Sequence, residues 1–203
     1  ASLDRPALDT PPAWLDAVAA EHHAVRERVA LIDLTSFAKL EVTGPDALAG
    51  LQHLAAADLD RPVGTCVYTQ LCNERGGIEA DLTVMRLAAD RFYIVTGSGF
   101  AVRDAGWIGS HLPADAALRE VTSERAVIAI VGPRSRDVLR HVSDDDLSNA
   151  AFPHFAVREI EIGLAPVRAA RVGYVGELGW ELHIPVEYAA HVYDLLVEAG
   201  KPL

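Results

Sequence analysis

Cysteine, basic residues and long apolar runs are all scarce in this chain, and each shortage narrows what the protein can be. The two cysteines, Cys66 and Cys72, lie six residues apart along one predicted strand, too far for an easy disulfide bridge. We therefore expect reduced thiols and an intracellular, cytoplasmic protein. No run of about 18 uncharged apolar residues is present, so no membrane-spanning helix is predicted. The N-terminus also lacks the basic-then-apolar order of a signal peptide.

The charge and the hydrophobicity of the chain exclude further classes of protein. The chain has 29 acidic and 18 basic residues, which gives a formal net charge of −11 at pH 7. This balance argues against a surface for nucleic acid or anionic membranes. Hydrophobic residues make up 50% of the 203 positions, so the chain can bury a substantial core and disorder is not expected.

Signals for metals and flavins are also weak. The adjacent pair His22-His23 lacks the spacing of metal ligands on a helix, and its ordinary interpretation is a helix surface. The nearest approach to a dinucleotide fingerprint is residues 97–99, where Val102 stands at the position of the third glycine. We therefore predict neither a metal site nor a flavin site in this chain.

The most informative stretch is residues 73–84, a predicted turn that leads into a strand. Gly76-Gly77 can take positive φ at little steric cost, which is typical of a tight turn. The next residues alternate with a period of two, which places Glu79 and Asp81 opposite the apolar face. The positions of that apolar face are Ile78, Ala80, Leu82 and Val84. A strand with a solvated outer face would show the same pattern, whereas the functional interpretation has Asp81 lining a pocket.

The chain also contains an internal repeat. Residues 38–45 resemble residues 126–133, and the offset between their Gly-Pro turns is 132 − 44 = 88 residues. Each copy reads as a strand, a Gly-Pro turn and an amphipathic helix, because proline fits the first turn of a helix. The matched order of later turns indicates a duplication. The later matches are 76–77 with 164–165, 92–95 with 180–183, and closing helices near 100–111 and 186–199.

The duplication predicts an α+β fold of two pseudo-repeated units, each strand–helix–three strands–helix. Residues 1–30 would form an N-terminal lead-in and helix, residues 31–122 the first unit and residues 123–203 the second. The helix is expected over residues 14–29, where apolar side chains recur at helical spacing. Two such units side by side leave a seam between them, which is a favoured place for a ligand.

The second unit carries an unusual loop at residues 171–180, in which three glycines surround Glu177. Glycines let the backbone approach a flat ligand closely and fix tight turns. An ordinary hairpin turn with an exposed glutamate would have the same composition. Tyr174 and Trp180 belong to residue types that more often pack against other side chains than contact a ligand.

Together these stretches resemble the folate-binding domain of the aminomethyltransferase family, which includes the glycine cleavage T-protein. The similarity is closer to the folate domain of dimethylglycine and sarcosine dehydrogenases, and it runs from about residue 21 to the end of the chain. The motifs that carry it are residues 76–84 and 173–179, supported by 25–29, 32–37, 62–64, 67–69 and 93–98.

The resemblance implies a three-lobed ring around tetrahydrofolate, with Asp81 near N5 and N10 as the catalytic group and Glu177 at the pterin edge. A carboxylate accepts two parallel hydrogen bonds well, which suits a pterin. A carboxylate near a reacting amine can take or give a proton and favour a cationic iminium. The other cofactor-binding positions that the resemblance implies are Tyr93, Val95, Tyr174 and Arg171.

The chain departs from the family in composition and length. Gly97 and Ala80 stand where glycine cleavage relatives commonly have Asn and Asp, and both differences fit the dehydrogenase branch. The family continues into a C-terminal β-rich lobe, which is lacking here, and the dehydrogenases carry an N-terminal flavin domain. We therefore expect a fragment or one lobe of an assembly, with the missing lobe or a flavin-dehydrogenase domain supplied elsewhere. Apolar surface left by the missing lobe would favour a homodimer.

The resemblance implies tetrahydrofolate-dependent one-carbon transfer, in which a methylene from a small amine is captured to give 5,10-methylenetetrahydrofolate. One alternative is a glycine cleavage T-protein proper, whose substrate is an aminomethyl-lipoyl carrier. Another is a folate-binding module without chemistry. The presence of Asp81 counts against the second alternative, and the missing lobe counts for it.

Overall fold

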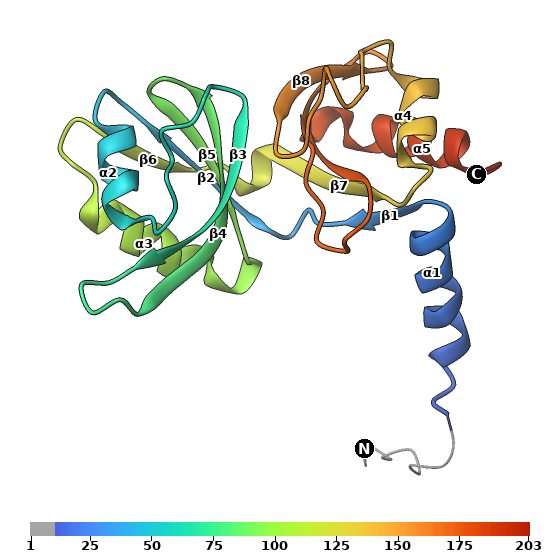
Figure 1. Cartoon of the computed structure of the whole chain (residues 1–203), viewed down its shortest axis with the longest axis horizontal. Helices are drawn as coiled ribbons and strands as arrows, with labels where there is room; N and C mark the ends of the chain where they lie inside the picture. The colour runs from blue at the N-terminus through green and yellow to red at the C-terminus, as the bar shows by residue number, and fades with distance from the viewer. Residues whose placement is uncertain (1–10) are drawn as a thin grey trace.

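The computed structural model describes residues 11–203, and the fold is α+β, as the sequence predicts (Figure 1). Its helices and strands are α1 (Leu15–Glu27), β1 (Ala30–Asp33), β2 (Ala38–Thr43), α2 (Ala47–Leu54), β3 (Thr65–Cys72), β4 (Ile78–Ala88), β5 (Arg91–Thr96), α3 (Ala101–His111), β6 (Ala117–Glu120), β7 (Arg125–Val131), α4 (Ser135–Val142), β8 (Val157–Ile162), β9 (Ala165–Ala170), β10 (Gly179–Pro185) and α5 (Ala189–Gly200). The strands form two antiparallel five-stranded sheets, ordered β3-β4-β5-β2-β6 and β1-β7-β10-β9-β8. No helix within the described range is long and apolar enough to cross a membrane.

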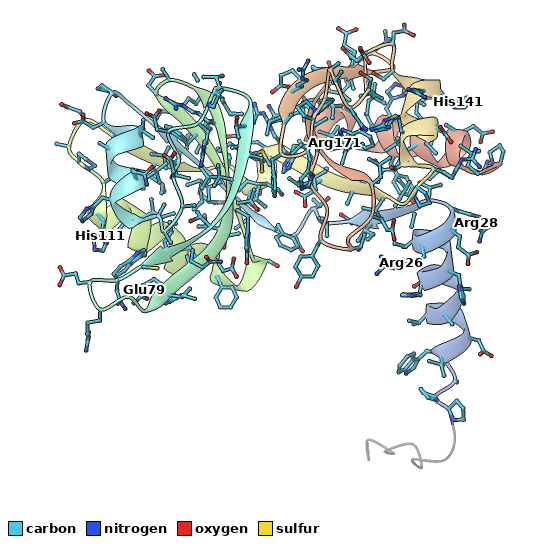
Figure 2. The ribbon with its side chains drawn as sticks, in the orientation of Figure 1. Arg26, Arg28, Glu79, His111, His141 and Arg171 are labelled. Carbon is cyan, nitrogen blue, oxygen red and sulfur yellow. The ribbon has the colours of Figure 1, made fainter. Side chains whose placement is uncertain are left out.

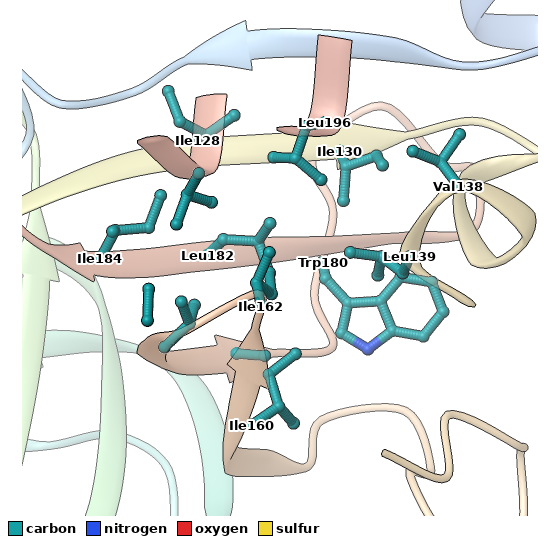
Figure 3. Packing of buried hydrophobic residues seen from close by; sticks show 14 of the residues in the cluster. Ile128, Ile130, Val138, Leu139, Ile160, Ile162, Trp180, Leu182, Ile184 and Leu196 are labelled. Atoms are coloured by element: carbon teal, nitrogen blue, oxygen red, sulfur yellow. The ribbon is translucent and has the colours of Figure 1, made fainter. Parts of the chain in front are cut away.

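The first sheet buries one face against α2 and α3. Leu40 of β2 lies opposite Ile94 of β5 in the antiparallel register, and both side chains are fully buried in this core. Because side chains alternate along a strand, Lys39 and Tyr93 point to the other face of the same sheet. The second sheet is built in the same way on α4 and α5. Figure 3 shows its core, where Trp180 and Leu182 of β10 pack among residues from the two helices.

The internal duplication is confirmed by the order of the elements. β5 begins at Arg91 and β10 begins at Gly179, which is 88 residues later. A 3₁₀ turn follows each strand, at Ser98–Phe100 and at Val186–Tyr188, again 88 residues apart. Each 3₁₀ turn leads directly into a closing helix, α3 or α5. Both units therefore contain the predicted strand–helix–three strands–helix order.

Each sheet also has a fifth strand that the predicted unit does not include. β6 pairs with β2, and β1 pairs with β7 so that Ala30 lies opposite Val131. A boundary at residue 31 assigns β1 to the first unit, and the structure corrects this, because β1 belongs to the second sheet. Lys39 helps to hold the segment that crosses between the sheets: its Nζ donates to the Thr35 carbonyl at 2.7 Å and to the Thr122 carbonyl at 3.2 Å.

The helix expected at residues 14–29 is present as α1, but none of its residues is buried, so the predicted apolar face is not covered. Figure 1 shows α1 extending away from the two sheets. Its C-terminal end is tied to the turn after β7, where Gly132 has a φ of +120°. A Cβ at Gly132 would lie 2.6 Å from the Arg28 carbonyl oxygen, so only glycine fits this approach. Of the predicted lead-in, residues 1–10 lie outside the described part of the chain.

The two sheets pack against each other through the faces that the helices leave free, which gives helix–sheet–sheet–helix layers (Figure 1). Met85 of the first sheet and Ala170 of the second share a buried apolar cluster there. The seam also contains polar contacts. Tyr93 Oη lies 3.2 Å from His183 Nδ1, and the Arg168 guanidinium lies over the Tyr93 ring at 4.9 Å.

Candidate functional site

Asp81 lies near the start of β4, on the face that turns away from the core of the first unit. Its neighbours Ala80 and Leu82 are 5% and 3% exposed in that core, so the predicted alternation is confirmed here. The Tyr68 hydroxyl of β3 donates a hydrogen bond to Asp81 Oδ2 at 2.9 Å. This contact raises the pKa of Tyr68, because the carboxylate acceptor favours the protonated phenol.

A cavity of about 190 Å³ lies beside Asp81. β4 pairs with β5 only from Thr83 onward, so the first residues of β4 have no strand on that side. Ile78, which the alternation assigns to the core, is instead 66% exposed: it lies beyond a register shift in the β3–β4 pairing and before the part of β4 that pairs with β5. The residues that line the cavity are Ile78, Glu79, Ala80, Asp81, Thr96, Phe100, Arg103 and Asp104.

Hydrogen bonds join several of these side chains. Arg103 Nη2 donates to Glu79 Oε2 at 2.6 Å, and Asn73 Nδ2 donates to Glu79 Oε1 at 2.7 Å. Asp104 is 1% exposed, and its Oδ2 accepts a hydrogen bond from the Thr96 hydroxyl at 2.6 Å. The cavity wall therefore contains acids on both β4 and α3.

Glu177 lies in the loop between β9 and β10 and pairs with α1. Arg26 Nη1 is 2.7 Å from Glu177 Oε1, and the two side chains are 46% and 26% exposed, respectively. Gly176, directly before Glu177, has a φ of +77° that favours glycine. Tyr174 in the same loop is fully exposed. Glu177 is therefore anchored on α1, and it is not among the residues that line the cavity beside Asp81.

Tyr93 and Val95 share the sheet face of Asp81 but lie progressively deeper. Val95 is opposite Thr83 and Tyr93 is opposite Met85, so the two residues occupy the next rows along β4. Tyr93 is 1% exposed, and burial raises its pKa while burial lowers the pKa of His183 beside it. Val95 therefore lies on the same face as Asp81, one row further along the sheet, whereas Tyr93 is enclosed in the seam between the sheets.

Arg171 does not join the other predicted residues. Its Nη1 donates to the Phe152 carbonyl at 2.6 Å, and its guanidinium lies over the Trp180 ring at 5.7 Å. Trp180 belongs to the core on the helix side of the second sheet, and Figure 2 shows Arg171 within that unit. Desolvation by burial, followed by the nearby Arg136, lowers the pKa of Arg171. These contacts give Arg171 a structural role, so we leave it out of the site.

Two residues at the site were not singled out from the sequence. Tyr68 could have been found from the hairpin register around Gly76-Gly77, since β3 and β4 pair with Gln70 opposite Asp81. Arg26 precedes Glu177 by 151 residues, and no local pattern in the sequence connects them.

Residues 3–203 match the family described as the GCVT N-terminal domain, so the chain belongs to this family. The chain is 42% identical over 193 residues to 4-methylaminobutanoate oxidase (formaldehyde-forming) from Paenarthrobacter nicotinovorans, covering 95% of the chain and 23% of that protein. It is 36% identical to the mitochondrial pyruvate dehydrogenase phosphatase regulatory subunit of Mus musculus, covering 94% and 22%. It is 32% identical to human mitochondrial dimethylglycine dehydrogenase, covering 93% and 22%. The chain thus spans less than a quarter of the length of these relatives.

Among solved structures, the chain resembles the glycine cleavage system aminomethyltransferase T from Bartonella henselae. The TM-score is 0.77 at 27% sequence identity, and the match covers 89% of this chain and 48% of that one. The resemblance to the aminomethyltransferase family and its fold is thereby confirmed. The chain also has enzymes among its relatives, namely the oxidase and the dehydrogenase.

Proposed function

We propose that this chain is the tetrahydrofolate-binding part of a one-carbon transfer enzyme, in which a methylene from a small amine is captured to give 5,10-methylenetetrahydrofolate. The observation that carries the proposal is the Asp81 carboxylate, which lies beside a cavity and accepts a hydrogen bond from Tyr68. The family membership supports it, as do relatives named for the oxidation of N-methylated amines.

The residues present fit a pterin, and bound tetrahydrofolate would supply the nucleophilic nitrogens. Glu177 Oε1 accepts from Arg26, and a carboxylate has about four lone-pair positions, so two parallel N–H donors of a pterin can still be accepted. The exposed ring of Tyr174 offers a stacking face. Val95 would contribute to the floor of the pocket, whereas Tyr93 would support that floor from within the seam between the sheets.

Asp81 is the group that would act on the donor. Tyr68 engages Oδ2 and orients the carboxylate, which leaves Oδ1 for the reacting amine. A positioned carboxylate that takes or gives a proton contributes about 10²–10⁴-fold to a rate. Its negative charge also stabilises positive charge that develops on the amine in the transition state.

The rest of the enzyme is proposed to lie outside this chain. The oxidase and the dehydrogenase are more than four times as long as the matched region, since the chain covers 23% and 22% of them. A flavin-dehydrogenase domain that generates the one-carbon unit, and a further lobe that closes the folate site, are the partners that we propose.

Two measurements test the proposal. Calorimetric titration with folinic acid measures binding, and formaldehyde capture by the tetrahydrofolate complex, above the uncatalysed rate, measures transfer. Asp81→Asn should keep the affinity and lower the capture rate by about 10²-fold or more. Glu177→Ala should lower the affinity by about tenfold, the effect of losing a charged hydrogen-bond partner. Asp144→Asn, in an exposed turn of the second unit, is the matched control. An unchanged capture rate in Asp81→Asn would refute the role of Asp81.

A folate-binding module without chemistry is the second candidate, because one relative is named as a regulatory subunit. Binding of folinic acid without any capture above the uncatalysed rate would favour this candidate. A glycine cleavage T-protein proper would instead release its one-carbon unit only from a lipoylated carrier protein, so an assay with that carrier separates it from the main proposal.

A further inference from the structure

The cavity beside Asp81 contains a buried acid that the proposed folate contacts do not use. Asp104, in the first turn of α3, is 1% exposed, and its Oδ1 has no hydrogen-bond partner among residues 11–203. Leaving a buried carboxylate oxygen without a donor costs free energy, so such an atom indicates a missing partner.

The neighbouring arginine does not supply that partner. Arg103 Nη1 lies 3.8 Å from Asp104 Oδ1, which is beyond hydrogen-bond distance. Arg103 donates instead to the main-chain and side-chain oxygens of Glu79, and Asn73 donates to the other oxygen of that carboxylate. The Arg103–Glu79–Asn73 group is therefore satisfied within itself, and Asp104 Oδ1 stays open.

The rest of the cavity favours a small cation with apolar substituents. Asp81 lines it as well, and Tyr68 engages only its Oδ2. A secondary ammonium group has two N–H donors, which matches two carboxylates that each have an oxygen available. At the rim, Phe100 and Ile78 are 59% and 66% exposed and offer apolar surface for a methyl group. The wall holds three acids and one arginine, a local charge of −2.

We propose that this cavity is the subsite for the amine of the one-carbon donor, a small N-methylated ammonium compound held between Asp104 and Asp81. The inference rests on the proposed function, in which the partner flavin-dehydrogenase domain takes a hydride from an N-methyl group and so supplies an iminium. When its methylene is transferred to the attacking nitrogen, the bond between that carbon and the donor nitrogen breaks. The donor nitrogen takes up the proton that the attacking nitrogen releases and leaves as this ammonium group, beside the catalytic carboxylate. The volume of about 190 Å³ holds about six groups the size of a water molecule, at about 30 Å³ each, which suits an amine as small as sarcosine.

The test is a nuclear magnetic resonance titration of the ¹⁵N-labelled chain with sarcosine, and with betaine as a matched control. Both ligands are cationic at nitrogen and carry a carboxylate, but betaine has no N–H to donate. Sarcosine should give saturable shifts in the amides of residues 79–81 and 96–104, with betaine about tenfold weaker, as expected for loss of a charge-assisted hydrogen bond. Asp104→Asn keeps an acceptor for Thr96 and should lower the affinity for sarcosine by about tenfold, whereas Asp144→Asn should leave that affinity unchanged.

The outcomes separate this inference from the proposed function. Absence of saturable shifts at the cavity, equal binding of betaine, or full sarcosine affinity in Asp104→Asn overturns the subsite. If Asp104→Asn does not fold, Phe100→Ala replaces it, since that side chain is exposed, and its sarcosine affinity should still fall. Folinic acid is titrated into the same samples: sarcosine binding without folinic acid binding supports the subsite and overturns the folate proposal, and the reverse overturns the subsite alone.

Discussion

Replacing Arg26 by alanine tests how Glu177 is held in place. The Arg26 Nη1–Glu177 Oε1 distance is 2.7 Å, and the side chains are 46% and 26% exposed. Partly exposed ion pairs of this kind contribute about 0.2–1 kcal/mol to stability, because water screens them and their long side chains lose entropy. Arg26→Ala should therefore lower the free energy of unfolding by no more than about 1 kcal/mol.

Folate binding should suffer more than stability. Without Arg26, the ligand itself must order the Glu177 side chain, at a cost of about 0.5–1.5 kcal/mol. Since about 1.4 kcal/mol corresponds to a factor of ten, the affinity should fall by about two- to tenfold. Arg26 is not expected to compete with the pterin, because a carboxylate has lone pairs for both partners.

Calorimetry with folinic acid and urea unfolding at the same pH measure the two effects of Arg26→Ala. Arg28→Ala is the matched control, because Arg28 is the C-cap residue just after α1, has a non-helical backbone and does not pair with Glu177 (Figure 2 labels both arginines). High salt screens the ion pair and should narrow the difference between the wild type and Arg26→Ala. Unchanged or tighter folinic acid binding in Arg26→Ala would refute the positioning role of Arg26.

Three further changes test the site, the seam and the core. Asp81→Asn should lower the pKa of Tyr68 towards its ordinary value, because the carboxylate that favours the protonated phenol is removed; carbon NMR of labelled tyrosines follows this, and an unmoved Tyr68 titration contradicts the contact. Burial lowers the pKa of His183 below its ordinary 6.5, so the unfolded state binds more protons and stability should fall as the pH drops through that value. His183→Gln should flatten this fall in urea unfolding between pH 7.5 and 5.5, and equal slopes would rule out His183 as its source. Leu182→Ala empties a fully buried position and should cost about 2–5 kcal/mol, whereas an unchanged urea midpoint would mean that the packing in Figure 3 is wrong.

The duplication and the orientation of Asp81 could be predicted because both follow from local rules. The turns recur at one offset, so matching their order was enough to find two units without knowing how the sheets pair. The face of Asp81 follows from alternation, since Ala80 and Leu82 must enter a core on the other side. These rules describe single strands and turns, and they therefore hold wherever a strand is covered on one face.

The remaining features depend on contacts between distant segments, which a local pattern does not contain. β1 is four residues long, and nothing in so short an apolar run distinguishes β7 from β2 as its neighbour. Arg171 lies in a glycine-rich loop whose composition resembles that of a ligand-binding loop. Its guanidinium, however, donates a hydrogen bond to the Phe152 carbonyl on another segment. Tyr93 is enclosed because residues of the second sheet, among them His183 and Arg168, cover it across the seam.

The two duplicated units contribute different parts of one proposed site. The reason is that one segment of the repeat is a strand and turn in the first unit and a loop in the second. In the first unit, residues 83–90 complete the β4–β5 ladder and its tight turn. At the offset of 88, the equivalent segment is residues 171–178, which leaves the sheet as a loop because β9 has six residues where β4 has eleven. The extended strand presents Asp81 on a rigid face, and the released segment carries Glu177 out to Arg26. The two carboxylates therefore come from non-equivalent positions of the repeat, so the proposed site is asymmetric although the fold is repeated.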